Sequence, residues 1–334
     1  MINFPTLSLK LRRSLNFIHK VDILSLFFYG CANLTSVKFH SKIREIQERV
    51  FFNCNSLDTL IIPDGVESLD IKEYCCFGCI FPLLKFRSKI NSISTQAFAN
   101  CKNPKEIILE SIPANIASGI FYNCTNIIKI TLNNDKIDIN LVNKMIDDVR
   151  SNINEVIVNI SSIPPCLFAN FVKLEKALLK SNKISDSMFE NCSSLRNVSL
   201  LLPTLPEKFD VGKRGFYNCL NLDVTILKRV RSIDDYGFYG CPFPRSIVIP
   251  KDILSISQYA FSNTRIEYVN FCSNQFICYS NSFDNKVKAY VTDSFANSPL
   301  CSLPTTRIDR SVCHIPHPTS QDVMYIVKMR TRKR

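Results

Sequence analysis

The chain is poor in the residues that most enzyme and cofactor sites require. It has 8 glycines and 4 histidines among 334 residues, and no tryptophan. Average glycine usage is about 7%, far above the share in this chain, so a glycine-rich loop that binds phosphate is not expected. No histidine lies between His40 and His314, which excludes a histidine-based catalytic or metal centre from the body of the chain. Apolar residues make up 46%, too many for intrinsic disorder.

Long apolar runs and paired carboxylates are also missing. The longest uncharged stretches, 23–37 and 156–172, are broken by polar residues or proline, whereas a membrane span needs about 20 apolar residues. The N-terminal residues lack the basic-then-apolar pattern of a secretory signal. We therefore expect no transmembrane segment, and this favours a cytoplasmic location. No pair of acidic residues is spaced for acid–base catalysis, so we expect no catalytic residue, no metal site and no cofactor.

What the chain does have is a repeated Phe-x-x-Cys tetrad. It occurs seven times, whereas the frequencies of the two residues predict about one occurrence. These anchors are Phe28/Cys31, Phe51/Cys54, Phe98/Cys101, Phe121/Cys124, Phe189/Cys192, Phe216/Cys219 and Phe238/Cys241. Degenerate copies bring the number to twelve: Cys76/Cys79, Met145/Asp148, Phe168/Phe171, Phe261/Thr264 and Phe283/Lys286. The mean period of about 23 residues predicts a solenoid of about twelve coils.

The residues after each anchor cysteine predict a short strand. Leu60 and Ile62 lie 6 and 8 residues after Cys54, and other copies repeat this spacing. Two apolar residues separated by one position have the alternation of a strand with one buried face. A second apolar pair, such as Val66 and Leu69, leads to the next anchor, and the segment around each Phe predicts a helical or 3₁₀ turn. Because no coil closes its own core, stacked coils place phenylalanine over phenylalanine and thiol over thiol.

This pattern resembles the BspA-type leucine-rich repeat, I-x-x-x-A-F-x-x-C-x-x-L-x-x-I-x-I-P. The clearest copies run from Cys241 to Pro250 and from Ser255 to Phe261. The resemblance covers about residues 20–290 and implies an α/β repeat solenoid with short parallel strands on its concave face. It also implies a non-catalytic surface or interaction protein, of a kind found in anaerobic bacteria and protists and in some cases linked to adhesion. It carries no catalytic residues, and it favours the cell surface as the location.

The repeat divides the chain into four parts. Residues 1–27 are expected to cap the first coil or to form a degenerate repeat, 28–286 to form the solenoid, 287–320 to cap the last coil, and 321–334 to form a basic tail. Four prolines in 287–320 argue against regular structure there. The tail has the charge to contact an anionic membrane, although a terminal charge run is most often a solubilising segment.

The 15 cysteines include two distinct groups. Eight are anchors, and we expect them to be buried, reduced thiols that act as small hydrophobic residues and weak donors. Cys75-Cys76-x-x-Cys79 resembles half of a zinc site, but no second C-x-x-C occurs, so we predict no metal there. Four cysteines lie outside the ladder: Cys272, Cys278, Cys301 and Cys313. A disulfide among these four would accompany export to an oxidising compartment.

Outward-facing strand residues are the candidates for contact with a partner. On the concave face, the central outward position lies between the two buried strand residues, and six of eleven such positions are aliphatic. These six are Ile61, Ile108, Ile157, Leu178, Ile226 and Val248. An exposed apolar stripe commonly marks a binding surface, although β-branched residues also simply suit strands.

We therefore predict a protein–protein interaction scaffold that binds a partner on its concave face. The alternative is a cell-surface adhesin or antigen that binds host or matrix proteins. Specific nucleic-acid binding is not predicted, because the aromatic side chains that would stack on bases are expected to be buried in the repeat core.

Overall fold

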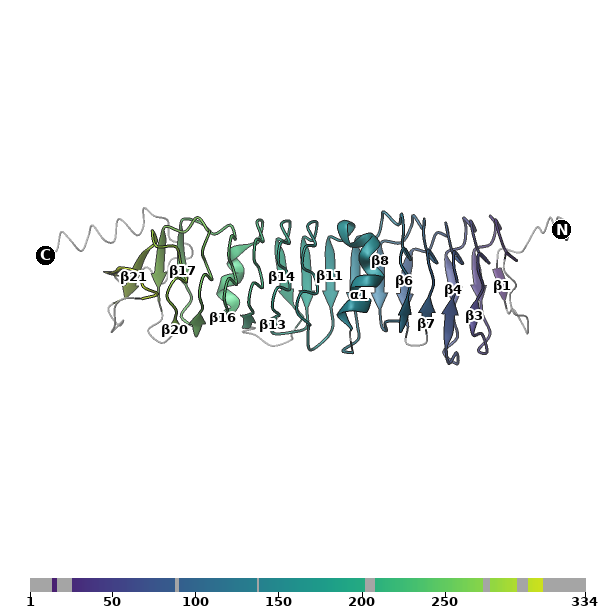
Figure 1. The fold of residues 1–334 in the computed structure, drawn as a ribbon, viewed down its shortest axis with the longest axis horizontal. Helices are drawn as coiled ribbons and strands as arrows, with labels where there is room; N and C mark the ends of the chain where they lie inside the picture. The colour runs from purple at the N-terminus through teal and green to yellow at the C-terminus, as the bar shows by residue number, and fades with distance from the viewer. Residues whose placement is uncertain are drawn as a thin grey trace. The chain divides into compact units, whose positions relative to one another are not determined.

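The computed structural model describes residues 14–16, 26–87, 90–136, 138–201, 208–272, 277–292 and 300–308. They belong to two compact units, unit 1 up to Asn159 and unit 2 from Ile160 onwards. Each unit is a stretch of parallel β-solenoid, and the two together have about 11 turns (Figure 1). Each regular coil gives one strand to a first sheet, one to a second sheet, and a turn that holds the anchor. The prediction of a repeat solenoid with short parallel strands is confirmed.

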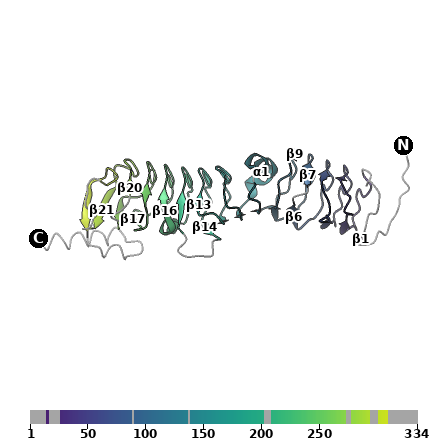
Figure 2. The ribbon, with the colours of Figure 1, turned by 90° about the horizontal axis from the view of Figure 1, so that it is seen from below.

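In unit 1 the first sheet contains the strands that follow each anchor. They form two parallel groups: β1 (Ser14–Asn16), β2 (Ser36–Lys38) and β4 (Thr59–Ile61), and then β6 (Leu83–Phe86), β8 (Glu106–Leu109), β10 (Lys129–Leu132) and β11 (Glu155–Val158). The second sheet contains β3 (Glu45–Ile46), β5 (Leu69–Ile71), β7 (Ile90–Ile93) and β9 (Asn115–Ile116). The helix α1 (Ile139–Ile146) lies on the same side as β7 and β9 (Figure 2), and the 3₁₀ helix η1 (Asp147–Asn152) follows it.

Unit 2 repeats this arrangement. Its first sheet contains β12 (Lys176–Leu179) and β14 (Asn197–Leu200), and then β17 (Ser246–Ile249), β19 (Tyr268–Phe271), β21 (Lys288–Thr292) and β22 (Thr305–Ile308). The 3₁₀ helix η2 (Val224–Arg229) lies in the sequence between the two groups. The second sheet contains β13 (Lys183–Ile184), β15 (Phe209–Val211), β16 (Val230–Ile233), β18 (Ser255–Ile256) and β20 (Ile277–Cys278).

The anchor turns differ from the predicted helical or 3₁₀ turn. Around Phe216, for example, Arg214 and Asn218 have φ of 55° and 56°. A right-handed helix cannot contain these left-handed residues, so the turn reverses without forming one. The second left-handed position is Asn or Gly, the types that adopt this region most readily, in ten turns: Gly30, Asn53, Gly78, Asn100, Asn123, Asn170, Asn191, Asn218, Gly240 and Asn263.

Two of these glycines also lie close to an asparagine side chain of the neighbouring coil. A Cβ on Gly78 would lie 2.8 Å from Oδ1 of Asn53, and one on Gly240 would lie 2.5 Å from Oδ1 of Asn218. Such contacts are too short for a carbon and an oxygen that are not bonded. At both positions an asparagine side chain of the preceding coil lies where the Cβ would be, and the residue is glycine.

The coil that contains α1 lacks the regular anchor turn. Asp138 begins the helix, since its carboxylate accepts the N–H of Asn140 at 2.8 Å, and Met145 is buried on the helix face toward the core. The predicted degenerate anchor Met145/Asp148 thus lies in helical structure. The carboxylate of Asp148 accepts the N–H of Phe121 at 3.1 Å, in place of the backbone carbonyl that other anchor N–H groups reach. Burial raises the pKa of Asp148.

The ladder continues beyond residue 286, into the segment expected to cap the solenoid. β21 and β22 extend the first sheet in parallel with β19, and Val287, Ala289 and Val291 alternate inward as in other strands. Pro304 precedes β22 and does not interrupt it. At the other end, β1 pairs with β2 from within the expected N-terminal cap. Most of residues 1–27, and all of 321–334, lie outside the described residues, so the tail stays a prediction.

Candidate partner-binding face

The anchor residues form two buried columns. Phenylalanine rings of successive anchors stack in unit 2, where ring centroids are 5.7 Å apart between Phe189 and Phe216 and 5.3 Å apart between Phe216 and Phe238. In the seven Phe-x-x-Cys anchors, every phenylalanine and cysteine is buried except Cys31, which is half-buried. The phenylalanine of each anchor is therefore committed to packing between coils and is not available to a ligand.

The second column consists of thiols that bond to the preceding coil. Sγ of Cys54 donates to the carbonyl of Phe28 at 3.0 Å, and Sγ of Cys219 donates to the carbonyl of Phe189 at 3.1 Å. The same bond recurs at Cys79, Cys101, Cys124, Cys192 and Cys241. The expectation of buried thiols that act as weak donors is confirmed.

Burial also makes these thiols unreactive. It raises the pKa of Cys54 and of Cys192 to about 12, so both stay protonated at neutral pH. A protonated thiol is neither a nucleophile nor a metal ligand. Across the part of the chain that the structure describes, no three His, Cys, Asp or Glu side chains are grouped to hold a metal ion. The partner-binding residues were predicted on the outward side of the first sheet, which we call the strand face.

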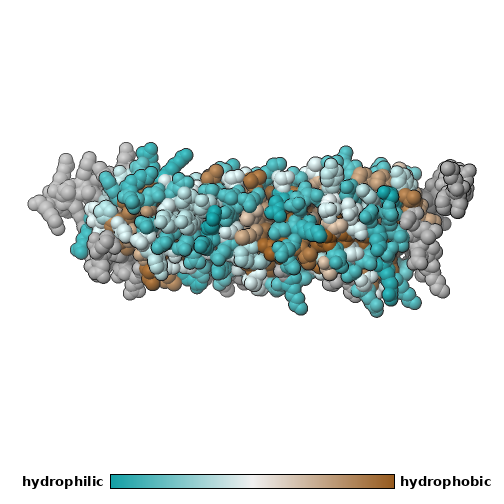
Figure 3. All heavy atoms as spheres, viewed as in Figure 1, coloured by the Kyte–Doolittle hydropathy of each residue, from teal (hydrophilic) through white to brown (hydrophobic). Residues whose placement is uncertain are grey.

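In unit 1 the strand face presents an apolar row. Ile108, Thr131 and Ile157 lie in register on β8, β10 and β11. Ile108 and Ile157 are partly exposed, as predicted, while Thr131 is buried and its hydroxyl donates to Oε1 of Glu106 at 2.5 Å. Figure 3 shows the side on which α1 lies, where hydrophobic residues around α1 also interrupt the hydrophilic surface of unit 1.

Charged residues in pairs border this row. Nζ of Lys129 lies 3.8 Å from Glu106 and 3.5 Å from Glu155, at the start of the same three strands. An apolar centre with a polar rim is the usual composition of a protein–protein interface. The carboxylates in this rim are engaged with lysine and a hydroxyl, so the arrangement suits binding rather than proton transfer.

In unit 2 the structure places two of the predicted residues on the strand face and corrects a third. Leu178 and Val248 are partly exposed on β12 and β17. Ile226 is not on a strand: it lies in η2 and is buried, with 6% of its surface exposed. Asp223 starts η2 by accepting the N–H of Thr225 at 3.0 Å. The adjacent apolar pair Ile226-Leu227, which lacks the alternation of a strand, was the signal for this.

Ile61, the remaining predicted residue, is the most exposed of the six at 45%. It lies on β4, beside the break between the two groups of first-sheet strands in unit 1. Leu60 was expected to be buried, but it is half-exposed at the same break. A cleft of about 330 Å³ opens there, and the repeat pattern did not predict it.

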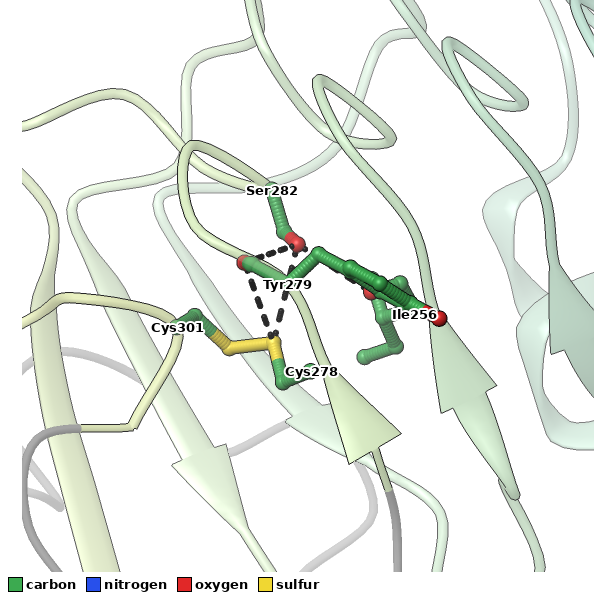
Figure 4. The surroundings of a disulfide bond; sticks show 5 residues. All are labelled: Ile256, Cys278, Tyr279, Ser282 and Cys301. Carbon is green, nitrogen blue, oxygen red and sulfur yellow. Dashed lines mark hydrogen bonds between the residues drawn. A yellow bond between two sulfur atoms is a disulfide. The ribbon is translucent and has the colours of Figure 1, made fainter.

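The cysteines outside the ladder include a disulfide. Cys278 of β20 is bonded to Cys301 (Figure 4), and Cys272 is also disulfide-bonded. The hydroxyl of Ser282, beside the bond, donates to the carbonyl of Ile256 at 3.2 Å. Cys313 lies outside the described residues. The structure thus places oxidised cysteines at the C-terminal coils and reduced ones in the ladder.

No helix within the described ranges has the length and apolar character needed to cross a bilayer.

Solved structures of other leucine-rich repeat proteins are similar to this chain. The chain is similar to a leucine-rich repeat protein from Bacteroides ovatus, with 19% identity, 89% of this chain and 87% of that chain covered, and a TM-score of 0.30. It is also similar to a leucine-rich repeat protein from Eubacterium ventriosum, with 18% identity, 72% of this chain and 79% of that chain covered, and a TM-score of 0.29. A third similar structure is the pneumococcal vaccine antigen PcpA, with 12% identity, 78% of this chain and 74% of that chain covered, and a TM-score of 0.26.

A search of the curated proteins found no match. The pattern of the BspA type leucine rich repeat region, by contrast, matches residues 21–143, 69–196 and 161–290. These matches span most of the chain and coincide with the coils described above. The chain therefore belongs to the BspA-type leucine-rich repeat family.

Proposed function

We propose that the chain is a non-catalytic scaffold that binds a protein partner on its strand face. The observation that supports this best is that Ile108 and Ile157 lie on either side of the buried Thr131, are held in register by the ladder and are bordered by charges of both signs. In a solenoid the backbone of this face is already ordered before a partner arrives. Binding then costs little additional ordering of the scaffold.

Affinity would come from shape and apolar burial. Completing the burial of one isoleucine or leucine side chain is worth about 1.5–3 kcal/mol at most, and less for a side chain that is already partly covered. A few such residues at the centre of an interface dominate its binding energy. Leu178 and Val248 offer the same chemistry in unit 2.

Placing a charge on the strand face is expected to weaken binding without unfolding the chain. Ile157→Asp and Leu178→Asp should each weaken binding of the native partner by about 2 kcal/mol, roughly 30-fold. Both side chains point away from the core, so the melting temperature should change little. The measurement is quantitative affinity capture from the native cell with each tagged variant, followed by titration calorimetry with the captured protein.

The matched control is Leu220→Asp, because Leu220 is 54% exposed but lies in the turn after an anchor and not on the strand face. This variant should capture the partner as the unmodified chain does. If all three variants retain the same partners with the same affinity, the part of the strand face around Ile157 and Leu178 is not the binding surface.

The second candidate function is a cell-surface adhesin or antigen that binds host or matrix proteins. The disulfide between Cys278 and Cys301 favours it, because structural disulfides persist mainly in oxidising compartments. The strand face would then bind a host protein in place of an intracellular one. Contact between residues 321–334 and an anionic membrane is a further prediction.

A further inference from the structure

The first sheet of unit 1 is interrupted between β4 and β6. β2 pairs with β4 and β6 pairs with β8, but β4 and β6 fall in separate sheets. The same two coils stay joined elsewhere: the N–H of Phe51 donates to the carbonyl of Cys75 at 2.8 Å, and β5 pairs with β7 in the second sheet. The coils therefore separate along the first sheet only, and each of the two strands keeps an unpaired edge.

The start of β6 also lacks a backbone donor that the start of β4 has. At the start of β4, the N–H groups of Asp58 and Thr59 both donate to the carbonyl of Thr35 in the coil before. Pro82 precedes β6 as Asp58 precedes β4, and proline has no N–H to offer. The chain between Cys79 and the strand is also one residue shorter than in the regular copies.

A groove with an apolar floor fills the separation. Its volume is about 330 Å³. It is lined by Leu60, Ile61, Ile62, Pro63, Asp64, Leu69, Lys85, Arg87 and Ile90. An apolar cavity of about 150 Å³ is large enough to hold benzene, so this groove has room for at least one large apolar side chain. We call it the β4–β6 cleft.

Two cations stand on the β6 wall of the cleft. Arg87 bonds to Asp64 on the opposite wall at 3.4 Å and lies 3.7 Å from Glu110, and Nζ of Lys85 lies 2.5 Å from Glu110. These ion pairs are exposed to solvent, so each is worth about 1 kcal/mol or less. A carboxylate on a ligand can replace Asp64 at little cost and keep both cations paired.

We infer that the β4–β6 cleft binds an extended segment of a partner polypeptide. The segment pairs with the free edge of β4, places an apolar side chain against Leu60 and Ile90, and sets an acidic side chain on Lys85 and Arg87. Addition of a strand to an open edge is a common mode of peptide recognition, in which main-chain bonds give affinity and side-chain pockets give specificity. The inference rests on the proposed function, because it names the partner chemistry for one part of the strand face.

The test uses a library of blocked, fluorescein-labelled hexapeptides. The flanking residues are threonine, and two inner positions vary over aliphatic, aromatic, acidic, basic and small polar residues. Fluorescence anisotropy with the full chain is expected to select peptides with an aliphatic residue followed by Asp or Glu. N-methylation of the peptide backbone, which removes a pairing donor, should weaken the selected peptides by about tenfold or more.

Variants of the chain locate the bound peptide. Ile61→Glu puts a negative charge beside the cleft, where it repels the acidic residue of the selected peptides. This variant should lower affinity for those peptides by about tenfold or more. Ile128→Glu is the matched control, since Ile128 is 39% exposed in the same unit against 45% for Ile61, and it should leave the affinity unchanged. Arg87→Ala should remove the preference for the acidic residue, and this readout holds even if Ile61→Glu unfolds the chain.

Three results would each overturn the inference: no library member binding at about 1 mM peptide, equal binding of the N-methylated peptides, or an acidic preference that survives Arg87→Ala. If one of these occurs while Ile157→Asp still weakens capture of the native partner, the cleft is excluded and the strand-face proposal stands. If the peptides bind as expected but Ile157→Asp and Leu178→Asp have no effect, the partner is confined to the cleft.

Discussion

Between about pH 8.5 and pH 10.5, the free energy of unfolding is expected to fall by about 1.4 kcal/mol per pH unit for each ladder thiol whose pKa burial raises, such as Cys192. Burial raises the pKa of Cys192 to about 12, whereas a thiol in the unfolded chain ionises near pH 8.5. In this range the unfolded state loses protons that the folded state keeps. The contribution of such a buried thiol to the free energy of unfolding is therefore complete below about pH 8.5 and is lost as the pH rises toward 12.

Several thiols act together in this prediction. Burial raises the pKa of Cys219 and Cys241 as well, and it raises the pKa of Cys54 to about 12. A domain is stable by only about 5–15 kcal/mol, so the summed loss should unfold the chain well before pH 11. Urea titrations followed by circular dichroism at successive pH values measure it.

The control for the alkaline transition is Cys219→Ala. It removes one ionisable thiol, so the slope of unfolding free energy against pH should become shallower by about one thiol's contribution. A urea midpoint that stays constant between pH 8 and pH 10 would contradict the buried thiol ladder.

The second large effect is expected in the phenylalanine column. Phe216→Ala should lower the free energy of unfolding of unit 2 by about 3–5 kcal/mol, because it removes a fully buried ring that stacks on Phe189 and Phe238. Each coil of a solenoid is stabilised by its two neighbours, so the loss affects both interfaces of the coil. Chemical denaturation of the variant and of the unmodified chain measures the difference.

The control for this substitution is Leu220→Ala. Leu220 follows the same anchor but is 54% exposed, so its removal should change stability by about 0.5 kcal/mol or less. A loss smaller than about 1 kcal/mol for Phe216→Ala would show that the rings do not carry the packing between coils.

The repeat, the two columns and the strand positions could be predicted because each depends on local spacing. The alternation of Ile107 and Leu109, for instance, is enough to place them inward and Ile108 outward. The conformation of the anchor turn could not be predicted from Phe-x-x-Cys alone, since a spacing of three fits a helical turn as well. The signal that was overlooked is the Asn or Gly two residues after Phe, as at Asn218.

The β4–β6 cleft could not be predicted from the sequence, because the features found beside it also occur where the strands stay paired. Pro82 precedes β6 without a donor, but Pro304 precedes β22 in the same way and β21 still pairs with β22. The shortened connection after Cys79 likewise recurs after Thr264, where β17 and β19 remain paired. Whether a ladder opens depends on the sum of contacts around both coils, which no single residue reveals.

The pairing of cysteines also needed the structure. Four cysteines outside the ladder allow three different pairings, and spacing does not choose among them. Cys278 and Cys301 are brought together because one ends β20 and the other lies where the next coil passes, with Cα atoms 5.0 Å apart. The ladder thiols, by contrast, follow directly from the repeat.

Cysteine mapping of the protein from its native cells tests most directly whether the repeat uses its thiols for packing while the C-terminal coils are oxidised. Alkylation before and after denaturation, followed by mass spectrometry, should find Cys166 labelled in the folded chain, since it is exposed. Cys192, Cys219 and Cys241 should be labelled only after denaturation, and a peptide linked through Cys278 and Cys301 should be found. Disulfides between anchor cysteines, or rapid labelling of Cys219 in the folded chain, would contradict the account.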